Sequence, residues 1–97
     1  MVVSTGTFAV FVGSIERIEQ VADKVAGFRA QGHDMVVVLS AMSGETNRLI
    51  GLAQQVQATP DPRELDVLVS TGEQVTIALL CMALKKRGVD ARALRIP

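Results

Sequence analysis

PRELDVLVSTGEQVTIALL, at residues 62–80, carries a short polar group (STGE, 70–73) inside an otherwise apolar run. The residues alone favour an ordinary helix boundary, in which Ser70 or Thr71 caps the next helix and Glu73 lies near the positive end of the helix dipole. The sequence therefore predicts a polar elbow between two helices.

The two helices flanking this elbow have clear limits in the sequence. Residues 63–69 form a short predicted helix with Pro62 at its first position, and residues 73–87 form a longer one that Gly88 ends. The second helix is so apolar that we expect it to be buried nearly all round. A second polar turn, SAMSGETN at 40–47, follows an apolar strand, so the two turns could converge on one ligand.

The rest of the chain reads as alternating strands and helices. Apolar residues predict strands over 7–12, 35–39 and 89–97 and helices over 15–28 and 49–56, with Ser14 as a cap and Gly32 as a stop. The continuous β-branched strand 35–39 is typical of parallel sheets covered on both faces.

This order predicts an α/β fold with right-handed crossovers and a mostly parallel sheet. In such sheets ligands bind beyond the carboxyl ends of the strands. That rule places Gly13, the turn 40–46 and the elbow 70–73 on the rim of a candidate site.

Composition excludes several classes of function. The 97 residues hold 10 basic and 10 acidic side chains and only 3 aromatic residues, all Phe, so nucleic acid is not an expected partner. The N-terminus lacks a basic region, and the apolar run 77–84 is too short to span a bilayer, so we expect no signal peptide and no membrane segment. One cysteine, Cys81, fits a buried thiol in a reducing, cytoplasmic location.

Common catalytic constellations are also missing. Cys81 and His33 lie far apart in different contexts, which predicts no metal site, and His33 reads as a solvated loop residue. His33 also precedes its strand, at the opposite end from Ser40, which argues against a Ser-His-Asp triad. The glycines match neither a P-loop nor a dinucleotide fingerprint.

Three blocks, in their order and spacing, resemble the N-terminal part of the aspartate kinase family, within the amino-acid kinase superfamily. The blocks begin at Gly13-Ser14-Ile15, Val36-Val37-Val38 and Arg63-Glu64-Leu65, and the resemblance covers roughly residues 13 to 91. It implies part of a three-layer sandwich with helices on both faces of the sheet. It also implies phosphorylation of the side-chain carboxylate of L-aspartate by ATP with Mg²⁺, the first step toward lysine, threonine and methionine.

The resemblance also assigns roles to single residues. Ser40 corresponds to a serine near the phosphates, which serves both substrate and cofactor, and Thr46 to a threonine that contacts the amino acid. Glu73 corresponds to the glutamate that binds the α-ammonium group, where a carboxylate gains a charge-assisted hydrogen bond. We expect no metal ligand among the residues of this chain.

Two departures from the family pattern bear on activity. The family opens with Lys-Phe-Gly-Gly-Thr-Ser-Val, whereas residues 7–12 here read TFAVFV, so the lysine and both glycines are absent and no catalytic residue is assigned. Residues 1–97 also match only the aspartate-binding part of the kinase domain, without the ATP lobe or the regulatory ACT domains.

We therefore expect a catalytically incompetent fragment. The alternative is a non-catalytic module that docks on a kinase or on itself, and self-association or binding to the missing remainder of the kinase is expected in either case. A decayed gene product, or a small kinase completed by a second chain, are further readings of the same residues.

Overall fold

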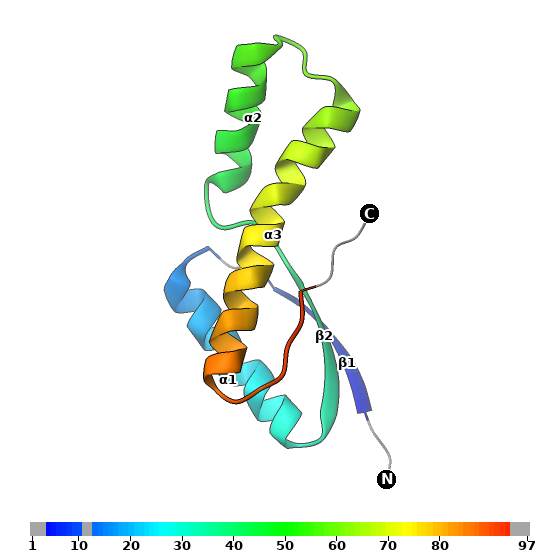
Figure 1. Cartoon of the computed structure of the whole chain (residues 1–97), viewed down its shortest axis with the longest axis vertical. Helices are drawn as coiled ribbons and strands as arrows, with labels where there is room; N and C mark the ends of the chain where they lie inside the picture. The colour runs from blue at the N-terminus through cyan, green and yellow to red at the C-terminus, as the bar shows by residue number, and fades with distance from the viewer. Residues whose placement is uncertain (1–3, 11–12, 94–97) are drawn as a thin grey trace.

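A computed structural model of the chain describes residues 4–10 and 13–93. Its elements follow the order β1 (Ser4–Val10), α1 (Ile15–Ala30), β2 (His33–Leu39), α2 (Glu45–Val56) and α3 (Pro62–Lys86) (Figure 1). The predicted α/β class is confirmed. The molecule is elongated, with extents of 55 × 26 × 17 Å, because the α2–α3 hairpin projects away from the βαβ unit.

The first half of the described chain is a βαβ unit. β1 and β2 pair in parallel, from Ser4 opposite His33 to Val10 opposite Leu39. The predicted cap of α1 is confirmed, since the Ser14 hydroxyl accepts a hydrogen bond from the Arg17 N–H at 3.2 Å. Gly32 follows α1 at a φ of +91°, which allows the chain to turn into β2.

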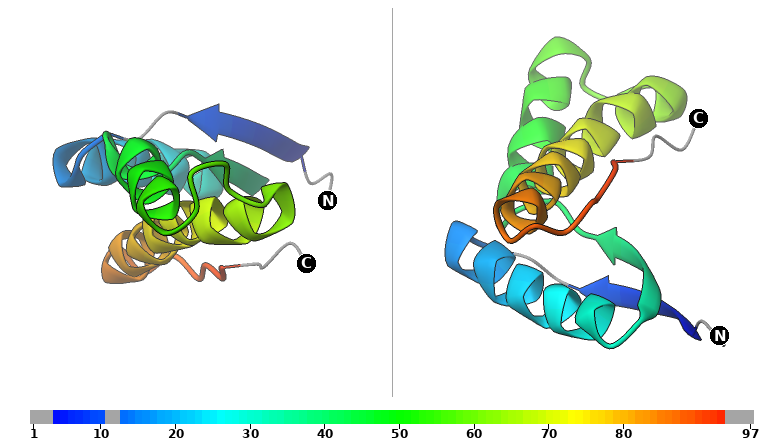
Figure 2. Two further views of the ribbon diagram at one scale, coloured as in Figure 1. Left: turned by 90° about the horizontal axis from the view of Figure 1, so that it is seen from above. Right: turned by 60° about the horizontal axis from the view of Figure 1, so that its bottom comes forward.

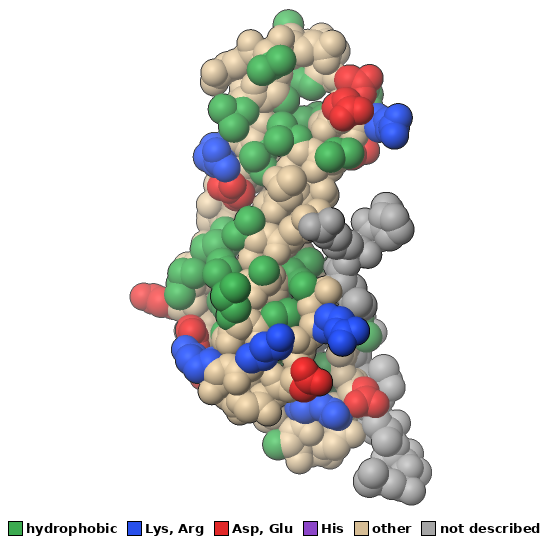
Figure 3. Space-filling view, in the orientation of Figure 1, with side chains coloured by type: hydrophobic (Ala, Val, Ile, Leu, Met, Phe, Trp, Pro, Cys, Tyr) green, Lys and Arg blue, Asp and Glu red, His purple; other side chains and the backbone are tan. Residues whose placement is uncertain are grey.

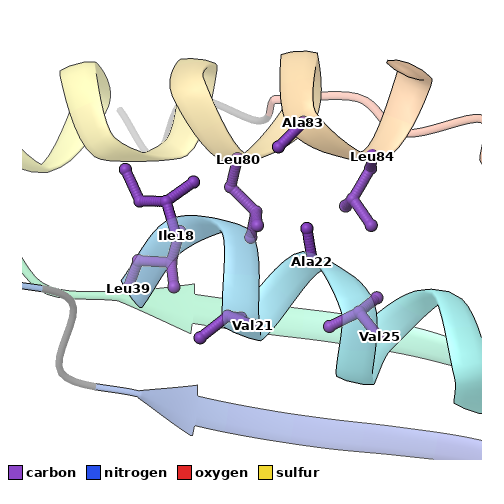
Figure 4. Packing of buried hydrophobic residues seen from close by; sticks show 8 residues of the cluster. All are labelled: Ile18, Val21, Ala22, Val25, Leu39, Leu80, Ala83 and Leu84. Carbon is purple, nitrogen blue, oxygen red and sulfur yellow. The ribbon is translucent and has the colours of Figure 1, made fainter. Parts of the chain in front are cut away.

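In the described residues, an apolar core joins α1, α3 and one face of β2. Figure 4 shows side chains of α1 and α3 pointing toward one another above the sheet, and the left view of Figure 2 places β1 and α3 at opposite edges of the molecule. The buried residues are Ile18, Val21, Ala22, Val25, Leu39, Leu80, Ala83 and Leu84. The carboxyl end of β2 is thereby held firmly against both helices.

Only one face of β2 is covered in the described part of the chain. Met35 and Val37 pack against the core, whereas Val36 and Val38 on the opposite face are 53% and 56% exposed. The prediction that this strand is covered on both faces is therefore wrong for the described residues. Helices cover one face of the sheet in the described residues, and the three-layer arrangement stays a prediction.

The polar group 70–73 does not form an elbow between two helices. α3 runs without interruption from Pro62 to Lys86, with Asp61 as its cap and Pro62 in its first turn. The Ser70 and Thr71 hydroxyls donate to the carbonyls of Val67 and Leu68, both at 2.7 Å, so these polar groups are satisfied inside the helix. The predicted boundary is wrong.

The carboxyl end of α3 closes as predicted. Gly88 adopts a φ of +79°, its N–H donates to the Lys85 carbonyl, and the Val89 N–H donates to the Leu84 carbonyl, each at 3.0 Å. This pattern is the Schellman motif. Residues 89–93 have no regular structure, and the rest of the strand predicted over 89–97 lies outside the described residues.

The prediction that α3 is buried nearly all round is also wrong. Its buried face carries Thr76, Leu80 and Ala83, whereas Val75 and Met82 are 52% and 65% exposed. At 25 residues, α3 has the length and apolar composition to cross a bilayer, so the argument from the short run 77–84 does not hold. Helices of protein cores pass the same test, and α3 packs on α1 and β2 as such a helix does.

Candidate functional site

The loops that follow the two parallel strands meet at one edge of the sheet. The Ser43 N–H, in the loop after β2, donates to the carbonyl of Gly13, in the loop after β1, at 3.3 Å. Carboxyl ends of parallel strands share an edge, which is where ligands bind in α/β folds. The sequence prediction that Gly13 and the turn 40–46 lie on a common rim is confirmed as a matter of geometry.

The middle of α3 reaches the same rim. A Cβ atom built at Gly72 would lie 3.1 Å from the Ala41 Cβ, 3.2 Å from the Glu45 Cγ and 3.5 Å from the Leu49 Cδ1. The backbone of α3 therefore contacts the loop after β2 and the first turns of α2 directly. All three rim segments predicted from the sequence come together, although the third is a helix and not an elbow.

Ser40 begins the loop after β2, and Thr46 lies just beyond it, in the first turn of α2. Ser40 follows the last residue of the strand, and Thr46 is the second residue of α2; both side chains are half-buried. Gly44, between them, precedes α2 and has no side chain to cap it. Its φ of +79° allows the chain to turn sharply into the helix.

Glu73 stands on α3 next to the Gly72 contact. Helical spacing places it on the same face as Ile77, Leu80 and Leu84, which lie one to three turns further on, beside β2. Because Leu80 and Leu84 pack in the core below the strand end, Glu73 stands near the carboxyl edge of the sheet. It is exposed, and within the described residues its carboxylate has no ion pair.

Glu45 and Arg48 form a charged pair on the same rim. The Arg48 Nε donates to one Glu45 carboxylate oxygen at 3.0 Å and a terminal nitrogen to the other at 2.5 Å. The hydrogen bond with Arg48 lowers the pKa of Glu45 below its usual value and raises that of the guanidinium. Sequence reasoning missed this pair, which the spacing of opposite charges by one helical turn could have indicated.

No cavity shared by Ser40, Thr46 and Glu73 is seen among the described residues. A cavity of about 300 Å³ lies below the rim, between β2, α3 and residues 89–92, with Leu39, Ile77 and Cys81 in its wall. Burial raises the pKa of the Cys81 thiol, although the side chain is half-buried and not fully enclosed as predicted.

His33 is not the solvated loop residue that the sequence predicted. It is the first residue of β2, is half-buried, and its ring meets the edge of Phe28 with ring centroids 6.0 Å apart. It nevertheless lies at the opposite end of β2 from Ser40, as predicted.

The described residues do not fit a site for MgATP by themselves. No group of three His, Cys, Asp or Glu side chains in residues 4–10 and 13–93 is placed to hold a metal ion. Arg48 on the rim is paired with Glu45, the Arg17 side chain in the first turn of α1 donates to Gln20, and the same turn is capped by Ser14. Phosphoryl transfer needs free cations or metal ions around the phosphates.

Comparison with known proteins bears on the same residues. The amino acid kinase family profile matches residues 2–97. Over 80 residues the chain is 75% identical to an aspartokinase of Pseudomonas aeruginosa and 52% identical to an aspartokinase of a Bacillus species. Each alignment covers 82% of this chain.

A solved structure is similar to this chain in both fold and sequence. A crystal structure of aspartate kinase from Synechocystis superposes with a TM-score of 0.78 at 44% identity, over 89% of this chain and 15% of that one. The chain spans 19% of the length of the Pseudomonas relative and 20% of the Bacillus one.

Proposed function

Because the chain belongs to the amino acid kinase family, we propose that it forms the amino-acid-binding part of an aspartate kinase catalytic domain. The similarity to aspartate kinases inferred from the sequence is confirmed by relatives of that name at 75% and 76% identity. The phosphate donor, the substrate and the roles of single residues belong to the proposal, because the chain spans about a fifth of those relatives.

One observation supports the proposal most strongly. The loop carrying Ser40, the first turn of α2 carrying Thr46 and the part of α3 carrying Glu73 lie around the Gly72 contact, at the carboxyl edge of the sheet. Hydroxyl groups, and a carboxylate with no ion pair among the described residues, are suited to a small zwitterion, whose ammonium group needs an anion and whose carboxylates need hydrogen-bond donors.

Each proposed residue has a distinct task. The Glu73 carboxylate accepts hydrogen bonds from the α-ammonium group of L-aspartate, and the Thr46 hydroxyl donates to a substrate oxygen. Ser40, at the end of β2, stands where the accepting carboxylate and the phosphate donor meet. These groups bind and orient the acceptor; they do not supply the charge that the transferring phosphate needs.

We further propose that the chain alone is catalytically incompetent. ATP and Mg²⁺ are the cofactors of the family, but the lysine of its first strand is replaced within TFAVFV at residues 7–12. Losing such a cation removes several kcal/mol of transition-state stabilisation, about a thousandfold in rate. The cytoplasm is the proposed location, in keeping with a single half-buried Cys81.

Binding of L-aspartate to the purified chain tests the proposal that it carries an amino-acid-binding site. We expect saturable heat in isothermal titration, and an affinity at least about tenfold lower for Glu73→Gln, because the amide keeps the shape but loses the charge. Succinate lacks the ammonium group, so it should bind the original chain weakly. Its affinity for Glu73→Gln should be the same.

The control is Glu64→Gln, which removes an exposed carboxylate from the first turn of the same helix. Its affinity for L-aspartate should equal that of the original chain. Equal binding of L-aspartate by the Glu73 and Glu64 variants would contradict the proposed role of Glu73.

Release of ADP from MgATP in the presence of L-aspartate tests the proposal that the chain alone is catalytically incompetent. We expect no turnover above background for the chain by itself, because the described residues lack a set of groups for the phosphates. A turnover rate of ordinary kinases, about 1 per second or faster, would reject incompetence.

The alternative function is a non-catalytic interaction module. Its support is apolar surface that the described residues leave open: Val36 and Val38 on the sheet and Val75 and Met82 on α3. Such a module would bind another kinase chain or a second copy of itself.

A further inference from the structure

Three glycines lie inside helices of the described chain, and one of them differs from the others. A Cβ atom at Gly27 in α1 or at Gly51 in α2 would meet nothing within 4 Å. A Cβ atom at Gly72 in α3 would meet three side chains. Glycine weakens a helix interior, so only at Gly72 does a close approach explain its presence.

The neighbours of Gly72 have little freedom to move. Ala41 and Leu49 are 7% and 5% exposed, and Glu45 is held by its paired hydrogen bonds to Arg48. On the helix side, the fully buried Thr76 donates its hydroxyl hydrogen to the Gly72 carbonyl at 3.2 Å. A methyl group at Gly72 would therefore require α3 and the loop to move apart by a few tenths of an ångström, since a contact of 3.1 Å between Cβ atoms is tighter than nearly all such contacts.

We infer that Gly72 is a positioning residue for the proposed amino-acid site. Its missing side chain sets how closely the middle of α3, with Glu73, approaches the loop and helix turn that carry Ser40 and Thr46. This inference rests on the proposed function, because it concerns the same three residues. It adds that the spacing of the site is fixed by a backbone contact that does not touch the substrate.

The test compares Gly72→Ala with Gly51→Ala, which adds the same methyl group to a helix interior where space is open. We expect Gly72→Ala to lower the affinity for L-aspartate by about tenfold or more, and Gly51→Ala to leave it unchanged. A rescue variant, Gly72→Ala with Ala41→Gly, removes the opposing methyl group and should restore most of the affinity.

Hydrogen exchange and amide chemical shifts of residues 40–46 provide a readout independent of the ligand. We expect Gly72→Ala, and not Gly51→Ala, to shift these amides and to speed exchange at Ser43, whose N–H bonds to Gly13. Equal affinity in the original chain and Gly72→Ala would overturn the inference. If the original chain bound no aspartate, the proposed binding site would be wrong. In that case, unchanged amide shifts and exchange rates of residues 40–46 in Gly72→Ala would also show that the Gly72 contact does not set the position of the loop.

Discussion

Arg87, which follows α3, links the end of this helix to α1 through hydrogen bonds. Its guanidinium donates to the Asp23 carboxylate at 2.8 Å, to the Glu19 carboxylate at 2.6 Å, and to the carbonyls of Ala83 and Glu19. Lys86 adds a bond to Glu19 at 2.8 Å. Figure 3 shows basic and acidic side chains gathered where α3 ends. The basic side chains at the end of α3 thus have specific partners on α1.

Removal of the Glu19 charge should make stability depend less on pH. The hydrogen bonds from Lys86 and Arg87 hold the pKa of Glu19 below its ordinary value of 4.5, so the folded chain favours the charged carboxylate. That stabilisation is complete above the unfolded pKa and is lost as pH falls through the lowered folded pKa. Glu19→Gln should therefore unfold at lower urea concentration near about pH 7, and the difference should shrink toward about pH 3.

Glu16→Gln is the matched control, since Glu16 is an exposed carboxylate in the first turn of α1 without an ion pair among the described residues. Urea unfolding followed by circular dichroism gives the midpoints. The same midpoint for Glu19→Gln and the original chain at about pH 7 would mean that the cluster contributes nothing to stability.

At the level of elements, local signals in the sequence located most helix ends. Ser14, Pro62 and Gly88 mark ends that the structure confirms, because capping depends on a few neighbouring residues. The polar group 70–73 misled the same reasoning. Its hydroxyls bond to carbonyls of their own helix, and its glycine serves a contact with a loop about 30 residues earlier, which no local pattern reveals.

For the candidate site, the sequence predicted which loops share an edge of the sheet, but not how α3 approaches that edge. Parallel strand order alone places Gly13 and the turn 40–46 on one edge, and the Ser43–Gly13 hydrogen bond agrees. That Glu73 stands on a helix beside this edge depends on how α3 packs over β2. Binding of aspartate by Ser40, Thr46 and Glu73 stays a prediction, because it depends on a ligand and not on the fold.

The whole molecule is less compact than an independent domain of its length. Its radius of gyration is 15.7 Å, against about 13 Å for a compact domain of about 100 residues. The α2–α3 hairpin extends beyond the βαβ unit, and the sheet face with Val36 and Val38 is open (Figure 1). An uncovered apolar sheet face is unusual for a monomer in water, because burying it is favourable.

We expect the purified chain to self-associate through this sheet face. Covering two half-exposed valines contributes about 1 kcal/mol each, so Val36→Thr with Val38→Thr should weaken association by about tenfold or more. Threonine keeps the β-branched shape that suits a strand, so the fold should persist. Sedimentation velocity over a range of concentrations measures the association, with Val56→Thr, 90% exposed on α2, as the control. A monomer at every concentration, or equal association in the two variants, would show that this face is not the contact and would weaken the interaction-module alternative.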